Sequence, residues 1–133
     1  MHYAPVLIVD DNAPTREVLK ARFRNKSIPC VEAGDAFTAM NMLGGERFSL
    51  VLMDVIMPGM DGLELMRWMA SSGIKVPVVA MSGTEMAAGV SYAHLAEELG
   101  AFWGIEKPVS DADIEEMESL RIPSMENGRY LSS

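Results

Sequence analysis

Short apolar runs alternate along the chain with amphipathic segments whose apolar residues recur near the helical period. The runs are short and mostly apolar, and residues 5–10 in particular are β-branched and apolar on both faces, as in buried parallel strands. They predict five strands, at residues 5–10, 28–31, 49–53, 76–81 and 101–105. The amphipathic segments predict five helices, within residues 12–23, 35–45, 61–73, 85–99 and 111–120.

Several polar residues and glycines mark the expected ends of these helices. Asn12, Asp35 and Asp111 are predicted to cap the first, second and last helix. Gly89 interrupts the first half of the segment 85–99, so the fourth helix is the least regular. Strands that alternate with helices indicate an α/β fold, in which a parallel sheet is covered on both faces by right-handed crossovers.

Composition restricts the class of protein. The chain has 133 residues, of which 49% are hydrophobic, which fits one globular domain. We expect that domain to cover 1–120, with 121–133 as a C-terminal tail or the start of a linker. The net charge of −8 argues against direct binding to nucleic acid or an anionic membrane. With neither a signal peptide nor a membrane span in the pattern, a cytoplasmic protein is the expectation.

Chemically active side chains follow the predicted strands. Asp10 and Asp11 end the first apolar run and Asp54 ends the third, whereas Ser82 and Lys107 follow the fourth and fifth. The carboxyl ends of parallel strands share one edge of the sheet, so these groups are expected to meet there. Two carboxylates ~4 Å apart repel by about 4 kcal/mol at an effective dielectric of 20. A cation would relieve that repulsion, and all-oxygen ligands with room for water favour Mg²⁺.

Four elements together resemble the receiver domain of two-component response regulators. They are the acidic pair Asp10-Asp11, Asp54 within the segment 53–62 (MDVIMPGMDG), Ser82, and Lys107-Pro108. The resemblance covers about residues 5 to 120 and implies a flavodoxin-like doubly wound sandwich with strand order 2-1-3-4-5.

The resemblance also implies a role for each residue. Asp54 would accept a phosphoryl group from a sensor histidine kinase or a phosphotransfer domain. Asp11, Asp54 and the backbone carbonyl of Ile56 would hold Mg²⁺, with Asp10 helping through water. Lys107 would pair with the phosphoryl oxygens, and the Ser82 hydroxyl would turn toward them. A cis peptide bond is expected before Pro108.

The sequence departs from the family pattern at the position three residues before the lysine. Receivers commonly carry an aromatic switch residue there, but this chain has Gly104, with Phe102 and Trp103 just upstream. The stretch from Ser82 to Gly100 is also a few residues longer than usual. In receivers, that longer stretch normally forms part of the signalling face.

The favoured interpretation is a phosphorylation-dependent switch, rather than a turnover enzyme, that changes binding to a downstream protein. One alternative is a receiver-like interaction module that needs no phosphate. A second, ranked lower, is a small Mg²⁺-dependent phosphatase, which would need a general acid where Ile56 stands. A homodimer through the last helices stays open as a further partner.

Overall fold

A five-stranded parallel sheet forms the centre of the computed structural model, which describes residues 2–83, 86–87, 90–126 and 129–130. The strand order is β2-β1-β3-β4-β7, which confirms the predicted flavodoxin-like order 2-1-3-4-5. The strands are β1 (Val6–Val9), β2 (Cys30–Ala33), β3 (Leu50–Asp54), β4 (Val78–Ser82) and β7 (Trp103–Glu106).

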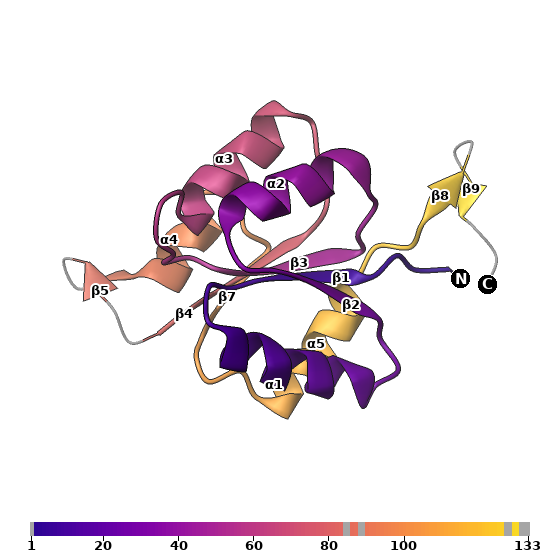
Figure 1. The fold of residues 1–133 in the computed structure, drawn as a ribbon, viewed down its shortest axis with the longest axis horizontal. Helices are drawn as coiled ribbons and strands as arrows, with labels where there is room; N and C mark the ends of the chain where they lie inside the picture. The colour runs from indigo at the N-terminus through magenta and orange to yellow at the C-terminus, as the bar shows by residue number, and fades with distance from the viewer. Residues whose placement is uncertain (1, 84–85, 88–89, 127–128, 131–133) are drawn as a thin grey trace.

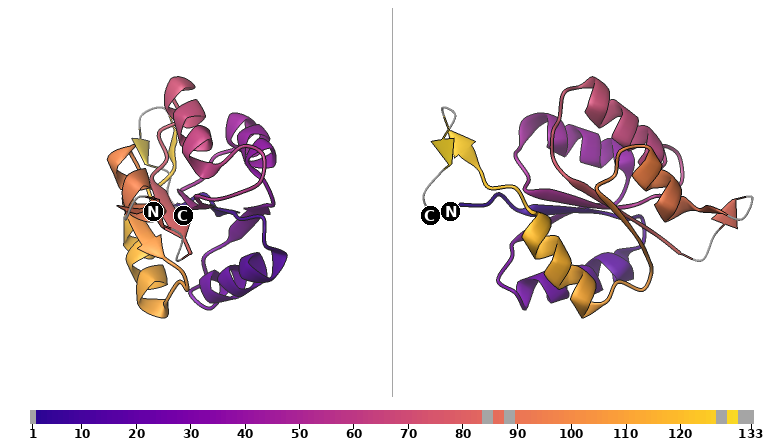
Figure 2. Two further views of the ribbon diagram at one scale, coloured as in Figure 1. Left: turned by 90° about the vertical axis from the view of Figure 1, so that its left-hand side faces the viewer. Right: turned by 180° about the vertical axis from the view of Figure 1, so that it is seen from behind.

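Helices cover both faces of this sheet. They are α1 (Ala13–Arg24), α2 (Ala36–Gly45), α3 (Gly62–Ser71), α4 (Tyr92–Glu98) and α5 (Asp111–Leu120). Helices α1 and α5 lie on one face, and α2, α3 and α4 lie on the other (Figures 1 and 2). Among the described residues, no helix is both long enough and apolar enough to cross a lipid bilayer.

Coverage of both faces explains why the central strands β1, β3 and β4 are almost entirely apolar. In β1, Val6 and Ile8 belong to the core on the α1 and α5 side, together with Phe23. Leu7 and Val9 belong to the core on the α2 and α3 side. All four β1 side chains are fully buried, so neither face of the strand tolerates a polar residue.

The register of the sheet brings the ends of the strands to one edge. Val9 of β1 is level with Met53 of β3, so Asp10 and Asp54 follow at the same height. Asp54 is level with Met81 of β4, and Ser82 is level with Glu106 of β7. Lys107 comes directly after that last pair, which places it at the same edge as the acids.

Several predicted boundaries differ from the structure by a few residues. Strand β2 begins at Cys30 rather than at residue 28, and β7 runs from Trp103 to Glu106 rather than over residues 101–105. Asp111 does not cap α5. The N-cap is Ser110, whose hydroxyl accepts a hydrogen bond from the Asp113 amide while the Asp113 carboxylate accepts one from the Ser110 amide. This capping box satisfies two amides at once, which a cap at Asp111 would not.

The predicted fourth helix is wrong in its first half. Helix α4 begins at Tyr92 rather than near residue 85. Ahead of it, β5 (Met86–Ala87) pairs antiparallel with β6 (Val90–Ser91). Gly89, which weakened the helical pattern in the sequence, lies outside the described residues.

The segment after α5 is bonded to the end of the sheet opposite the acids. The Ile122 amide donates to the Ser49 carbonyl at 3.0 Å, and the Ser124 amide donates to the His2 carbonyl at 2.8 Å. Further along, β8 (Met125–Glu126) pairs antiparallel with β9 (Arg129–Tyr130).

Candidate functional site

Three carboxylates meet at the carboxyl edge of the sheet. Asp54 ends β3 with only 6% of its surface exposed, and Asp10, directly after β1, is fully buried. Asp11 is exposed at the rim. One oxygen from each carboxylate lies within 4.8 Å of the others, so the convergence expected from the strand ends is present.

The Lys107 ammonium lies between two of these acids. Its Nζ donates to Asp10 Oδ2 at 2.9 Å and to Asp54 Oδ2 at 3.1 Å. The Lys107–Pro108 peptide bond is cis, as the resemblance implied. Lys107 therefore contacts both the candidate phosphoacceptor, Asp54, and the buried acid beside it, Asp10.

Burial and the ion pair act in opposite directions on these groups. Burial raises the pKa of the Asp54 carboxyl above its ordinary value, and the nearby Lys107 charge opposes that shift. Burial alone would lower the pKa of Lys107, but its hydrogen bond with Asp10 and its attraction to Asp54 outweigh burial and raise that pKa. The lysine is therefore held in its charged form.

Backbone amides fix the remaining oxygens of the two buried acids. Asp10 Oδ1 accepts from the Asn12 amide at 2.8 Å, and Asp54 Oδ1 accepts from the Ile56 amide at 3.1 Å. The N-cap of α1 is Asn12, whose side-chain oxygen accepts from the Thr15 amide at 2.9 Å. The acidic pair is therefore not the cap of α1, and a purely capping role for it does not account for its position.

The acids border a small polar cavity that suits a hydrated divalent cation. The cavity has a volume of about 270 Å³. Its lining is Asp10, Asp11, Asn12, Thr15, Asp54, Ile56, Gly83 and Lys107. A hard ion such as Mg²⁺ prefers carboxylate and carbonyl oxygens and keeps several waters, which matches oxygen donors beside an open rim. The residues present therefore fit the ion.

Ser82 lies at the same edge of the sheet but does not line this cavity. Its side chain is fully buried at the end of β4. Its hydroxyl donates to the carbonyl of Gly83 at 3.3 Å, and Gly83 is the residue that faces the cavity. A turn of this hydroxyl toward a phosphoryl group stays a prediction.

Gly104 occupies a tightly packed position between β7 and α4. A methyl group placed there would lie 2.2 Å from the carbonyl oxygen of Ala93. The Gly104 amide donates to a carboxylate oxygen of Glu97 at 2.7 Å. An aromatic side chain at this position would not fit with α4 where it lies, whereas Phe102 is 67% exposed two residues earlier.

Arg16 and Glu32 contribute contacts at this edge of the sheet that the sequence pattern did not predict. Arg16 lies on α1 and bonds both the Asp10 backbone and the Glu32 side chain on β2. The available signal was a carboxylate, Glu32, directly after the predicted strand 28–31, and a predicted first helix that carries several basic residues. That signal indicates an ion pair but does not reveal the contact with a backbone carbonyl.

Comparisons with known proteins agree with this geometry. The family model described as "Response regulator receiver domain" matches residues 6–118. The chain is 34% identical over 126 residues to the Regulator of RpoS of Escherichia coli (strain K12), covering 93% of this chain and 36% of that protein. It is 38% identical over 120 residues to protein-glutamate methylesterase/protein-glutamine glutaminase 1 of Cereibacter sphaeroides, covering 88% of this chain and 32% of that protein.

A solved structure shows the same fold. The crystal structure of FixJ-N superposes with a TM-score of 0.79 at 28% identity, covering 90% of this chain and 94% of that one. The chain belongs to the response regulator receiver domain family, whose members are phosphorelay signalling domains. It spans about a third of the length of the two curated relatives, 36% and 32%.

Proposed function

We propose that this domain is a phosphorylation-dependent switch in which Asp54 accepts a phosphoryl group from a sensor histidine kinase or a phosphotransfer domain in the cytoplasm. One observation carries the proposal. The Asp54 carboxylate is nearly buried and lies 3.1 Å from the Lys107 ammonium, which also binds Asp10. A surface carboxylate with a structural role would need neither the buried acid beside it nor the shared cation.

The transfer step follows from this arrangement. A carboxylate oxygen of Asp54 attacks phosphorus, the bond between phosphorus and the donor imidazole nitrogen breaks, and the imidazole leaves with the electron pair. The Lys107 ammonium pairs with both Asp54 and Asp10. It can therefore stay bound to Asp10 while it turns from the Asp54 oxygen to the negatively charged oxygens of the incoming phosphoryl group. The Ser82 hydroxyl would turn from the Gly83 carbonyl to a phosphoryl oxygen.

Mg²⁺ would be held by Asp11, Asp54 and the carbonyl of Ile56, with Asp10 acting through water. Its chemistry there is to neutralise charge that develops on the transferring group. The chain's own part is to keep three acids close enough to need that neutralisation. Their oxygens lie within 4.8 Å of one another.

Phosphorylation would add about −1.5 to −2 charges at the edge of the sheet. A change from 1:99 to 99:1 between two conformations needs about 5.5 kcal/mol of differential stabilisation. A few new contacts at Ser82 and Lys107 would supply less than this, so they would shift the populations of two conformations rather than switch them completely. The shift would change the affinity for a downstream protein. Recognition by a downstream protein, or pairing of two copies of the chain, would follow from that shift.

A mass measurement tests this proposal. The protein is incubated with Mg²⁺ and phosphoramidate, a small donor with a phosphorus–nitrogen bond, and the intact chain is weighed. We expect a gain of one phosphoryl group that is absent without Mg²⁺ and absent in Asp54→Asn. Asp61→Asn is the matched control, since Asp61 caps α3 rather than entering the cavity.

The same measurement separates the alternatives. No mass gain in the wild type would support a phosphate-independent interaction module. The close packing of α4 on Gly104 is the observation that favours this second candidate, because it closes the usual aromatic switch position. Rapid consumption of donor over many turnovers would instead indicate a phosphatase, for which Ile56 offers no general acid.

A further inference from the structure

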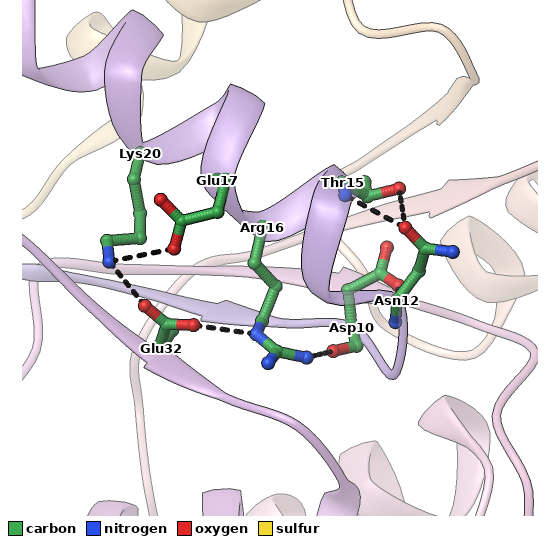
Figure 3. Close-up of polar contacts among 7 residues, drawn as sticks. All are labelled: Asp10, Asn12, Thr15, Arg16, Glu17, Lys20 and Glu32. Carbon is green, nitrogen blue, oxygen red and sulfur yellow. Dashed lines mark hydrogen bonds and ion pairs between the residues drawn. The ribbon is translucent and has the colours of Figure 1, made fainter.

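We propose that Arg16 is a positioning residue for the Mg²⁺ site, because it holds the peptide that joins Asp10 to Asp11. This inference rests on the proposed function. Arg16 Nη1 donates to the backbone carbonyl of Asp10 at 2.7 Å, and Arg16 Nε donates to Glu32 Oε1 at 2.8 Å (Figure 3). Only 16% of the Arg16 side chain is exposed.

The contact with Asp10 acts on Asp11 through the planarity of the peptide bond. The Asp10 carbonyl and the Asp11 amide belong to one rigid plane, so fixing that carbonyl also fixes the direction in which the chain enters Asp11. The Asp10 side chain has its own anchors in Lys107 and the Asn12 amide. Within the described part of the chain, the Asp11 carboxylate has no hydrogen-bond or ion-pair partner. Its orientation therefore depends on the backbone that Arg16 holds.

The guanidinium fork is suited to this task. It reaches a carbonyl of the β1–α1 connection and a carboxylate of β2 at the same time, which a single ammonium cannot do with the same geometry. Space for it comes from Gly34, where a methyl group would lie 3.3 Å from Arg16 Nη1. Arg16 thus links the β1–α1 connection to strand β2.

Glu32 offsets the positive charge of Arg16, which would otherwise repel a cation bound at the acids. The Arg16 hydrogen bond, followed by that of Lys20, holds the pKa of the Glu32 carboxyl below its usual range, so this acid stays ionised. Lys20 bonds the other Glu32 oxygen but does not contact Asp10 (Figure 3). Arg16 and Lys20 therefore share an ion-pair partner and differ in the contact with the Asp10 carbonyl.

That difference provides a matched control. Mg²⁺ is titrated calorimetrically into the unphosphorylated wild type, Arg16→Met, Arg16→Lys and Lys20→Met, with Asp11→Asn as the baseline for loss of a ligand. We expect Arg16→Met to raise the Kd for Mg²⁺ on the order of tenfold, in the range seen when groups that orient metal ligands are removed. Arg16→Lys is expected to raise the Kd by a smaller factor, and Lys20→Met to leave it at the wild-type value.

Phosphorylation by phosphoramidate gives a second, kinetic measurement. In Arg16→Met, the Mg²⁺ concentration for half-maximal rate should rise with the Kd, while the rate at saturating Mg²⁺ stays close to that of the wild type. A general loss of folding would instead lower the rate at saturating Mg²⁺. If Arg16→Met does not fold, Arg16→Lys decides the matter by its Kd alone.

A wild-type Kd in folded Arg16 variants would overturn the inference. Equal weakening in Lys20→Met would also overturn it, because the effect would then come from the charges around Glu32 rather than from the Asp10 carbonyl. A wild type that binds Mg²⁺ but takes no phosphoryl group would contradict the proposed function, and the titration would still test Arg16.

Discussion

Around Asp54, the residues that would promote transfer of a phosphoryl group differ from those that would determine how long it remains. Lys107 and the neighbouring acids lie beside the attacking oxygen. Ile56 lines the same cavity with 41% of its surface exposed, two residues after Asp54. Its amide bonds the Asp54 carboxylate, but its side chain is a hydrocarbon and can neither accept nor donate a hydrogen bond.

We therefore expect the phosphorylated protein to be long-lived, and Ile56→Asn to shorten its lifetime several-fold, because an amide at the rim can orient a water toward phosphorus. The measurement is the decay of phosphorylated protein, followed by intact mass after removal of the donor. Ile56→Leu is the control, since it keeps an apolar side chain of the same size, and its decay should match the wild type. An unchanged decay rate in Ile56→Asn would reject a role for this position.

The sequence predicted the acids and the lysine of the site, but not their supporting contacts. Asp10, Asp54 and Lys107 each follow an apolar run, and the pattern of a parallel sheet brings such positions together. The bond from Arg16 to the Asp10 carbonyl has no counterpart in the sequence pattern, because it depends on a backbone atom and on the space left at Gly34. Contacts of this kind become visible only when the loop path is known.

At the scale of elements, helix α4 packs closely on strand β7. Strand β7 is at the edge of the sheet, and α4 approaches it closely enough that the Ala93 carbonyl leaves no room for a methyl group on Gly104. Glu97 completes the contact by accepting the Gly104 amide. Strand and helix are thus joined by the Gly104 amide and the Glu97 carboxylate, at the position where receivers commonly carry an aromatic side chain.

Gly104→Ala should therefore destabilise the domain by roughly 1 to 3 kcal/mol, the usual cost of overpacking a site that cannot relax freely. Gly44→Ala is the control, since Gly44 lies in α2 with no atom within 4 Å of a new methyl group, and alanine favours a helix. The free energy of unfolding is measured by urea denaturation. Equal stability of the two variants would show that α4 moves away from β7 at little cost.

The same region shows where sequence patterns were insufficient. The apolar spacing of residues 85–99 predicted a helix interrupted at Gly89, yet among the described residues of this stretch only Tyr92–Glu98 is helical, and the preceding ones form the antiparallel pair β5 and β6. Periodicity cannot separate a short helix from a short antiparallel pair when the apolar residues are few. The central strands β1, β3 and β4 were predictable because their runs are almost entirely apolar, and the boundaries of all five sheet strands differ by only a few residues.

At the scale of the whole molecule, the two ends of the sheet have different roles. The carboxyl end of the sheet carries the acids and Lys107, whereas the amino end is joined to the segment after α5. There Arg121 Nε donates to Ser49 Oγ at 2.9 Å, and Nη2 donates to the Ala4 carbonyl at 3.0 Å. Its guanidinium also lies 4.6 Å from the centre of the Tyr3 ring. One side chain thus ties the end of α5 to both β1 and β3.

Because these contacts lie a full strand length from the acids, stability and metal binding should separate. Arg121→Ala is expected to lower the free energy of unfolding by roughly 2 to 3 kcal/mol, from two charge-assisted hydrogen bonds and one cation–π contact, and to leave the Kd for Mg²⁺ at the wild-type value.

Arg22→Ala is the control for loss of an arginine, since its pair with the exposed Asp111 should contribute at most about 1 kcal/mol. Urea denaturation and Mg²⁺ titration of the same samples give both quantities. If Arg121→Ala weakened Mg²⁺ binding as much as Arg16→Met, the two ends of the sheet would be coupled, and the local effect proposed for Arg16 would have to be attributed to the stability of the whole domain.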